Sequence, residues 1–208
     1  MSRYARLAFT EGVRHVQEEK GSAPAMQRLL RGDTGEPDPL GPAEAAFIES
    51  RDGFYLATVG ETGWPYVQFR GGPPGFVHVL NERTLGYAEV RGNRQYITGG
   101  NLRTNNRVSM FFMDYASQTR LKVFGHLEPR TPSDIPGIDV QLSAARTEGH
   151  PECLMIAHIE GFAWNCSQHI TPRFTRDEVT RALGPLYERV AQLEQENEEL
   201  KSRLEERG

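Results

Sequence analysis

The sequence has few cysteines, no long apolar run and no excess of positive charge. Its 208 residues include only two cysteines, Cys153 and Cys166, which are too few for a disulfide framework. The longest apolar runs, such as residues 108–113, fall far short of the roughly 20 apolar residues of a membrane-spanning helix. The formal net charge of −4 does not favour nucleic acid or an acidic membrane as a partner. The first residues lack the apolar segment of a signal peptide, so we expect a cytoplasmic protein.

The remaining composition is sufficient for one globular domain with additional elements at its ends. Hydrophobic residues make up 38% of the chain and aromatic residues 9%, which is enough to build a core. Residues 1–41 are more polar and begin with a helical pattern, in which Leu7, Phe9, Val13 and Val16 share one side. Glycines and prolines then interrupt residues 21–42, which predicts an irregular arm there.

The middle of the chain is rich in segments typical of β-strands. The predicted strands are 54–59, 64–70, 76–80, 85–90, 107–115, 119–128 and 153–164. Turn residues join several neighbouring segments into hairpins, and Pro65 is tolerable only at a strand start or at a sheet edge. Short helices are expected at 42–50, where Pro42 suits the first turn, and at 138–148. Six or seven short strands with few helices predict an antiparallel β-barrel, a mainly β fold, over residues 42–174.

Residues 175–208 have a different pattern, which predicts a coiled-coil helix. Apolar residues recur at alternating spacings of three and four, with Asn197 at one inner position. Position a of this heptad is occupied by Val190, Asn197 and Leu204, and position d by Leu186, Leu193 and Leu200. The pattern favours a zipper-like contact between two copies of the chain, and the alternative is a single solvated helix lying on the barrel.

The segment after the strand 85–90 offers a candidate site for an anion. Arg91 and Arg94 flank Gly92 and Asn93, and we expect a helix to start here with Asn93 as its capping residue. Free backbone N–H groups at a helix start, together with arginine, bind phosphate. Arg70, at the end of another strand, would add a second cation if the strands are neighbours. The alternative is that these arginines are ordinary solvated surface residues.

Several motifs of the chain, in the same order, resemble the flavin mononucleotide (FMN)-binding split-barrel family, whose best-known member is pyridoxamine 5′-phosphate oxidase. The similarity covers about residues 42–174 and is carried by residues 64–76, 85–102, 106–115, 119–128 and 164–174. It is closest to a bacterial subgroup named after that oxidase. The resemblance implies a flavoprotein with FMN as cofactor, an oxidoreductase acting on a small molecule, and a homodimer with the flavin site at the subunit interface.

The resemblance also implies roles for individual residues. In the family, an early strand lends side chains to the flavin, and the turn after the fourth strand grips its phosphate. The residues at these positions are Gln68, Arg70, Asn93, Arg94 and Gln95. Gln95 stands where the oxidase has a lysine, so one positive charge is lost.

Further residues follow from the second half of the similar region. The sixth strand of the partner subunit approaches the ring in the family, and a late tryptophan lies near the flavin. Here these residues are Arg120 and Trp164, and Asn165 follows. The basic residues that bind the oxidase's substrate are replaced by Gln168, His169 and Arg173, so pyridoxamine phosphate oxidation itself does not follow from the resemblance. No catalytic residue is assigned.

The stretch around Trp164 also permits other interpretations. A metal site would draw on His150, Cys153, His158, Cys166 and His169. Only Cys166 and His169 are close in sequence, and zinc sites prefer tight ligand pairs. A Cys166 nucleophile with His169 as base lacks an identifiable orienting group. We therefore predict no metal and favour a lining segment of the flavin pocket over a strand end that binds nothing.

The cofactor and the activity have alternatives of their own. A deazaflavin would fit a similar barrel and would make the protein a reductase. The chain would alternatively be a non-catalytic sensor or carrier that binds flavin or haem. We expect neither nucleic acid nor membrane as a partner.

Overall fold

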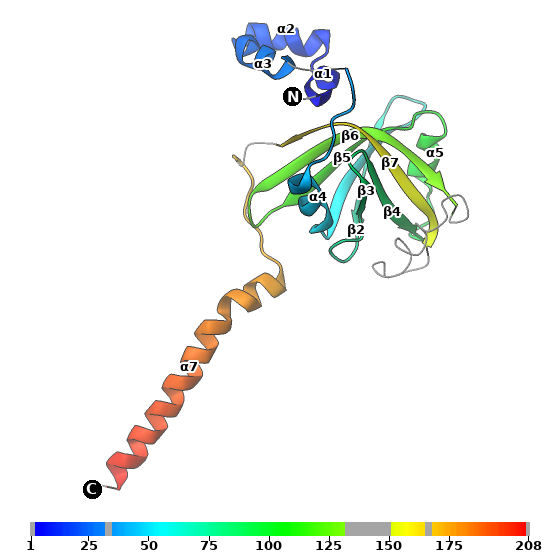
Figure 1. Cartoon of the computed structure of the whole chain (residues 1–208). Coiled ribbons are helices and arrows are strands. Elements are labelled where there is room, and N and C mark those ends of the chain that lie inside the picture. Colours follow the sequence, from blue (N-terminus) through cyan, green and yellow to red (C-terminus); the bar gives the residue numbers. More distant parts are fainter. Residues whose placement is uncertain (1–2, 32–34, 132–150, 165–167, 207–208) are drawn as a thin grey trace.

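The fold is an antiparallel barrel of seven strands, with short helices around it and one long helix at its C-terminal end (Figure 1). The computed structural model describes residues 3–31, 35–131, 151–164 and 168–206. The strands are β1 (Gly53–Val59), β2 (Pro65–Gly71), β3 (His78–Asn81), β4 (Thr84–Val90), β5 (Arg107–Asp114), β6 (Thr119–Arg130) and β7 (Pro151–Trp164). The mainly β class is confirmed, and each predicted strand lies within two residues of the observed ends.

The strands form a single sheet in the order β2-β1-β5-β6-β7-β4-β3, and every pair is antiparallel. The hairpins β1–β2, β3–β4 and β5–β6 join strands that are neighbours in the sequence. β2 and β3 are the two ends of this order, so backbone pairing does not close the barrel there. Pro65 begins β2 on this edge, as the sequence predicts, because proline cannot donate a ladder hydrogen bond.

Alternation along the strands places one set of side chains inside the barrel. In β5 and β6 every second residue is buried, which is the period of a strand with one face in the core. Phe54 of β1 is in ring contact with Phe76, Tyr87 and Phe112 at centroid distances of 5.1–6.0 Å. Each large apolar side chain buried in this way contributes about 1.5–3 kcal/mol. These ring contacts fill the centre of the barrel with packed side chains.

Three short helices precede the barrel: α1 (Arg3–Ala8), α2 (Glu11–Glu19) and α3 (Ala23–Leu30). The single N-terminal helical pattern is therefore divided into two helices, because the Thr10 hydroxyl accepts a hydrogen bond from the Val13 N–H and starts α2. The prediction of an irregular arm from residue 21 is wrong for α3. Pro24 lies at the start of α3, where its missing N–H costs nothing, and helix-forming residues follow it.

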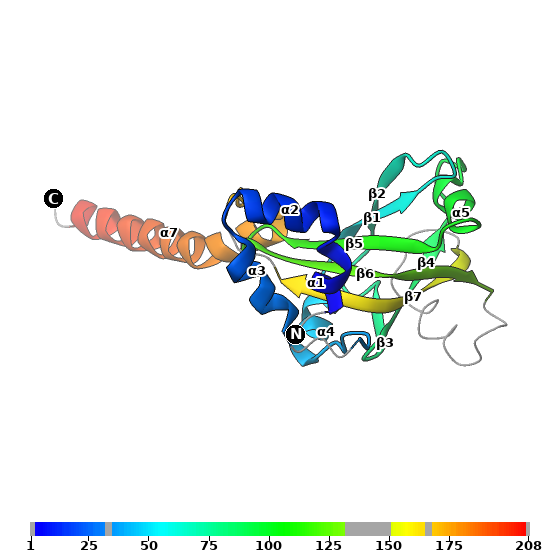
Figure 2. The same ribbon diagram turned by 90° about the horizontal axis from the view of Figure 1, so that it is seen from above.

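Helix α1 lies against the outside of β6 and β7 (Figure 2). Its first backbone N–H groups, those of Arg3 and Tyr4, donate to the two carboxylate oxygens of Asp38 at 2.9 and 3.3 Å. The Tyr4 ring stacks on Phe124 of β6 at 4.5 Å. Gly161 of β7 allows this approach, since a Cβ there would overlap the backbone of Tyr4. The α1 contact therefore depends on one glycine and one carboxylate.

The other helices among the described residues are α4 (Pro42–Glu49), α5 (Ile97–Leu102) and α7 (Arg176–Glu205). α4 confirms the helix predicted at 42–50, whereas the helix predicted at 138–148 lies outside the described residues. α7 begins at a capping box, in which the side chains of Thr175 and Glu178 bond each other's backbone N–H groups. It extends away from the barrel, and its heptad side chains are solvent-exposed (Figure 1). The long C-terminal helix is thus confirmed, and its pairing with a second copy stays a prediction.

Among the residues that the structure describes, every helix is too short or too polar to traverse a lipid bilayer.

Candidate functional site

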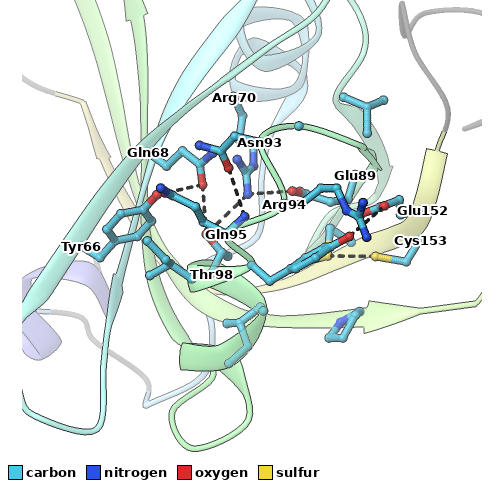
Figure 3. A pocket seen from close by; sticks show the side chains of 18 residues that line it. Tyr66, Gln68, Arg70, Glu89, Asn93, Arg94, Gln95, Thr98, Glu152 and Cys153 are labelled. Carbon is cyan, nitrogen blue, oxygen red and sulfur yellow. Dashed lines mark hydrogen bonds and ion pairs between the residues drawn. The ribbon is translucent and has the colours of Figure 1, made fainter.

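A pocket of about 300 Å³ is lined by side chains from the edge strand β2 and from the segment that leads into α5 (Figure 3). Its walls come from β2, the end of β4, the segment 92–96, the start of α5 and the start of β7. Of the residues predicted for the site, it gathers Gln68, Arg70, Asn93, Arg94 and Gln95. The structure therefore brings together residues that are up to 27 positions apart in the sequence.

Strand alternation supplies one wall of this pocket. Tyr66, Gln68 and Arg70 occupy alternate positions of β2 and are half-buried, whereas the residues between them are exposed. The Gln68 amide oxygen accepts hydrogen bonds from the hydroxyls of Tyr66 and Thr98, both at 3.3 Å. Arg70 Nη2 donates to the Thr98 hydroxyl at 3.4 Å. These bonds hold the amide and the guanidinium in position before any ligand is present.

Arg70 is paired with a carboxylate that the sequence analysis missed. Its Nη2 lies 2.7 Å from Glu89 Oε1, and the side chains are only 14% and 23% exposed (Figure 3). Burial raises the pKa of Glu89 above its ordinary value, although the Arg70 charge opposes this shift. Glu89 stands two positions after Tyr87 on β4, so the two share a face of the strand, and this spacing was the available signal. The positive charge of Arg70, a candidate for binding phosphate, is thus already partly neutralised by Glu89.

The segment between β4 and α5 has an unusual backbone. Arg94 and Tyr96 have φ angles of 65° and 52°, in the left-handed region that non-glycine residues rarely adopt. Asn93 does not cap a helix, contrary to the prediction: its side-chain oxygen accepts from the Gln95 N–H at 3.2 Å, and α5 begins only at Ile97. Asn93 forms a turn instead of a helix cap because an asparagine side-chain oxygen can accept a hydrogen bond from the backbone two residues later. This turn directs the segment over the pocket.

Two other charged residues at the rim of the pocket, Arg91 and Glu152, form an ion pair. Glu152 Oε1 accepts from Arg91 Nε at 3.0 Å and from the Tyr96 hydroxyl at 3.1 Å, and these bonds lower the pKa of Glu152. Arg94 makes no hydrogen bond or ion pair with any of the described residues, and its side chain is exposed at the pocket. Arg94 is therefore the cation that is available to a ligand without displacing a protein carboxylate.

The remaining described site residues lie at the other end of the barrel. Trp164, the last residue of β7, donates from Nε1 to Glu44 Oε1 at 2.7 Å and packs edge-on against Phe47 at 4.8 Å. Arg120 is near, because its neighbour Leu121 pairs with Trp164 across the β6–β7 ladder. Gln168, His169 and Arg173 follow and are exposed, with Arg173 positioned over the Tyr115 ring at 5.0 Å. Asn165 lies outside the described residues.

The two groups of residues are far apart within one chain. Cys153 of the first pocket and Trp164 are eleven residues apart on β7, which corresponds to roughly 35 Å of extended strand. Figure 2 shows α5 and the start of α7 at opposite ends of the barrel. Within one protomer, Trp164 therefore does not wall the pocket that contains Arg70. That role requires the Trp164 of a second copy, and it stays a prediction.

The described cysteines and histidines that were considered for a metal site or a cysteine nucleophile are dispersed. Cys153 lines the first pocket, where burial raises the pKa of its thiol, and its sulfur contacts Met155 at 3.7 Å. His158 of the same strand is exposed and pairs with Glu128 at 3.3 Å. The described part of the chain contains no group of three or more such residues arranged to hold a metal ion. His150 and Cys166 lie outside the described residues.

Comparison with known proteins agrees with this architecture. Residues 40–137 match a family model described as pyridoxamine 5′-phosphate oxidase. A search of curated proteins gave no match.

Three solved structures of similar chains are compared with this one. A Group A Streptococcus HupZ structure is 16% identical, with a TM-score of 0.47 and coverage of 65% of this chain and 100% of that one. A Clostridium acetobutylicum protein related to general stress protein 26, of the pyridoxinephosphate oxidase family, is 16% identical, with a TM-score of 0.39 and coverage of 64% and 92%. A structure described as an F420 reductase is 18% identical, with a TM-score of 0.39 and coverage of 62% and 100%.

The matched residues 40–137 contain β1 to β6 and all of the first pocket apart from its β7 residues. The inward residues of β2 and the turn at 91–96 fall within this region, whereas β7 lies outside it. The match of residues 40–137 and the observed barrel thus support a split barrel like that of the pyridoxamine 5′-phosphate oxidase family.

Proposed function

We propose that the protein binds FMN between two copies of the chain and catalyses a two-electron oxidoreduction of a small molecule. The observation that carries the proposal is the convergence of Gln68, Arg70, Asn93, Arg94 and Gln95 on one pocket in a barrel of this family. Flavin binding is common in the family, and these are the residues that its resemblance assigns to the cofactor. The pocket lies within the size range of ligand sites, which is about 300–1,000 Å³.

The pocket residues fit the polar half of such a cofactor. Arg94 carries a free guanidinium at the opening, which suits a phosphate group. The amides of Gln68, Asn93 and Gln95 offer donors and acceptors for hydroxyls and ring carbonyls. A bound flavin would supply the electron-transfer chemistry, and the protein would bind it, orient it and exclude water. This explains why the pocket shows no acid–base pair of its own.

A symmetric dimer would complete the site. Each chain places its cationic pocket at one end of the barrel and Arg120, Trp164 and Arg173 at the other, so two-fold symmetry can join unlike ends. β2 also exposes apolar side chains on its outer face: Val67 is 60% exposed and Phe69 56%. Exposed apolar patches of this kind mark interaction surfaces.

Titration of the purified chain with FMN should show binding and a flavin absorbance spectrum. Arg94→Met is expected to weaken binding about tenfold or more, because it removes a charge-assisted hydrogen bond worth about 1.5–3 kcal/mol. Arg103→Met is the matched control, since Arg103 is exposed just beyond α5 and does not line the pocket. A chain that neither carries nor binds FMN would refute the proposal, and a deazaflavin or haem spectrum would select one of the alternatives.

The C-terminal helix is expected to strengthen the dimer. Leu193→Lys introduces a charge at an inner heptad position and should raise the dimer dissociation constant at least about tenfold, because a lysine buried in an apolar seam is costly. Gln192→Lys places the same side chain one position off the seam and serves as the control. Sedimentation of both variants gives the answer: equal dissociation constants would mean that α7 is a single solvated helix.

A further inference from the structure

We propose that Glu89 occupies on Arg70 the place of an anionic ligand group, so that such a group enters the pocket together with a proton for Glu89. The proposal rests on the proposed function for the identity of the ligand, a flavin phosphate. The argument from charge applies to any anion that Arg70 binds.

The geometry gives Arg70 a partner before any ligand arrives. Glu89 Oε1 accepts from Arg70 Nη2 at 2.7 Å across the interior, where β2 and β4 are not neighbours in the sheet. Arginine binds carboxylate and phosphate with the same fork of donors. An incoming phosphate and the Glu89 carboxylate therefore compete for one guanidinium, and two anions side by side on it repel each other.

The Arg70–Glu89 ion pair leaves some of its polar atoms without hydrogen bonds, so a ligand could offer bonds that the pair lacks. Among the described residues, the buried atoms Arg70 Nε and Glu89 Oε2 have no hydrogen-bond partner. Buried polar atoms are normally bonded, and an unmade bond costs about 1–3 kcal/mol. An anion would accept from Arg70 Nε, and a proton would turn Glu89 into a hydrogen-bond donor. Ligand and proton together thus complete the bonding that the free pocket lacks.

The surroundings of Glu89 do not supply a second cation for it. The charged side chains that line the pocket are two arginines and two glutamates, so their formal charges cancel. The titratable and charged groups that interact with Glu89 are Arg70 on β2, Tyr87 on β4 itself, and Glu152 and Cys153 on β7. Arg94 in the turn lines the same pocket but forms no ion pair with Glu89. Tyr87 is fully buried with a raised pKa, and Glu152 is occupied by Arg91. If Arg70 paired with a ligand anion instead, Glu89 would have no close positively charged partner.

Anion binding is expected to add a proton to Glu89, and this sets the direction in which affinity changes with pH. Burial already raises the pKa of Glu89 in the free protein, and a bound anion raises it further. Between these two pKa values the complex holds one proton more than the free protein. In that window the affinity for the anion falls by up to about tenfold for each unit of increase in pH.

The test compares the wild-type chain with Glu89→Gln, which keeps the shape and removes the charge. FMN dissociation constants are measured by calorimetry from pH 5 to 9 on full-length protein freed of flavin. The phosphate of FMN titrates near pH 6, but it does so equally for both proteins. The ratio of the wild-type constant to the Glu89→Gln constant is therefore expected to rise with pH, by about tenfold or more over the range.

Two controls separate charge from structure. Glu152→Gln removes the other carboxylate of the pocket and should change affinity without adding to the slope, because Glu152 is exposed and already paired with Arg91. Riboflavin, which lacks the phosphate, should bind both proteins with the same pH dependence. Proton uptake by wild-type protein, measured in buffers of different ionisation enthalpy, needs no variant and guards against a misfolded Glu89→Gln protein.

Each outcome decides between the proposals. Parallel pH profiles for wild type and Glu89→Gln, with no proton uptake, would overturn the role of Glu89 and leave flavin binding intact. Failure of every protein to bind FMN at any pH would overturn the proposed function instead. Inorganic pyrophosphate is then the probe: a Glu89-dependent slope for it would support the competition for Arg70, and a flat ratio or no binding would end that inference as well.

Discussion

Arg70→Met should lower the free energy of unfolding by about 3–5 kcal/mol at neutral pH, as is typical when one member of a buried ion pair is removed. The variant leaves Glu89 inside the barrel with its closest cation gone, at 2.7 Å in the wild type. It also deletes the donor to Thr98, whose side chain is buried. Chemical denaturation of both proteins at pH 7 measures the loss.

The pH dependence of Arg70→Met is expected to differ from that of the wild type. The folded-state pKa of Glu89 is raised by burial, and removal of Arg70 raises it further. A carboxyl whose pKa is higher in the folded than in the unfolded state binds more protons when folded. Stability therefore falls as the pH rises from the ordinary glutamate pKa through the folded one, and acidification within this window should recover part of the loss.

Two variants provide the comparison for this prediction. Arg94→Met removes an arginine from the same pocket. Because Arg94 is exposed, this substitution should lower the free energy of unfolding by less than about 0.5 kcal/mol. The double variant Arg70→Met/Glu89→Gln removes the stranded charge and should regain much of the stability. If Arg70→Met proved as stable as Arg94→Met, the buried pair would not have the energetic role that we assign to it.

Gly125→Ala is expected to destabilise the whole barrel by about 3 kcal/mol, at the upper end of overpacking costs. Gly125 lies in β6 opposite Ile159, where the β6–β7 register shifts, and it is buried. A Cβ there would overlap the backbone carbonyl oxygen of His158. Because that neighbour is backbone in the centre of the sheet, it cannot move aside without breaking ladder hydrogen bonds. In a protein of this size the melting temperature should fall by roughly 6–12 °C.

Gly161→Ala is the matched variant, since its Cβ would also overlap backbone, that of Tyr4 in α1. α1 is peripheral and can move away as a unit, at the cost of its Asp38 and Phe124 contacts. We expect the barrel to keep most of its stability and residues 3–8 to lose protection in hydrogen exchange. An equal fall in melting temperature for both variants would contradict this distinction.

The strands were predictable because their sequence patterns are local. β5 and β6 alternate residue by residue, and short polar turns separate the strands, so neither needed knowledge of distant contacts. The same reasoning failed at α3 and at Asn93. Glycines and prolines around residues 21–42 mark breaks, but they do not exclude a helix of eight residues between them. Asn93 has the chemistry of both a helix cap and a turn, and only the backbone that follows it decides between them.

The pocket was predictable in part. Arg70 and Arg94 were singled out as cations of one site, and both line it. Glu89 was missed because a charged residue near the end of a predicted strand is usually solvated, and its face depends on how β4 is placed against the rest of the sheet. Trp164 was correctly placed at the end of the last strand, but the strand is long enough to carry it to the opposite end of the barrel.

The mainly β class, the positions of the strands, the long terminal helix and the resemblance to a family could all be read from the amino-acid sequence. These properties follow from periodicity, from turn residues and from motifs in order, all of which are written along the chain. Which charged side chains meet could be learned only from the folded structure. Whether Arg70 faces water, a ligand or Glu89 depends on the curvature of the sheet that brings β2 and β4 across the interior, and electrostatic energy depends on that distance and on burial rather than on sequence spacing.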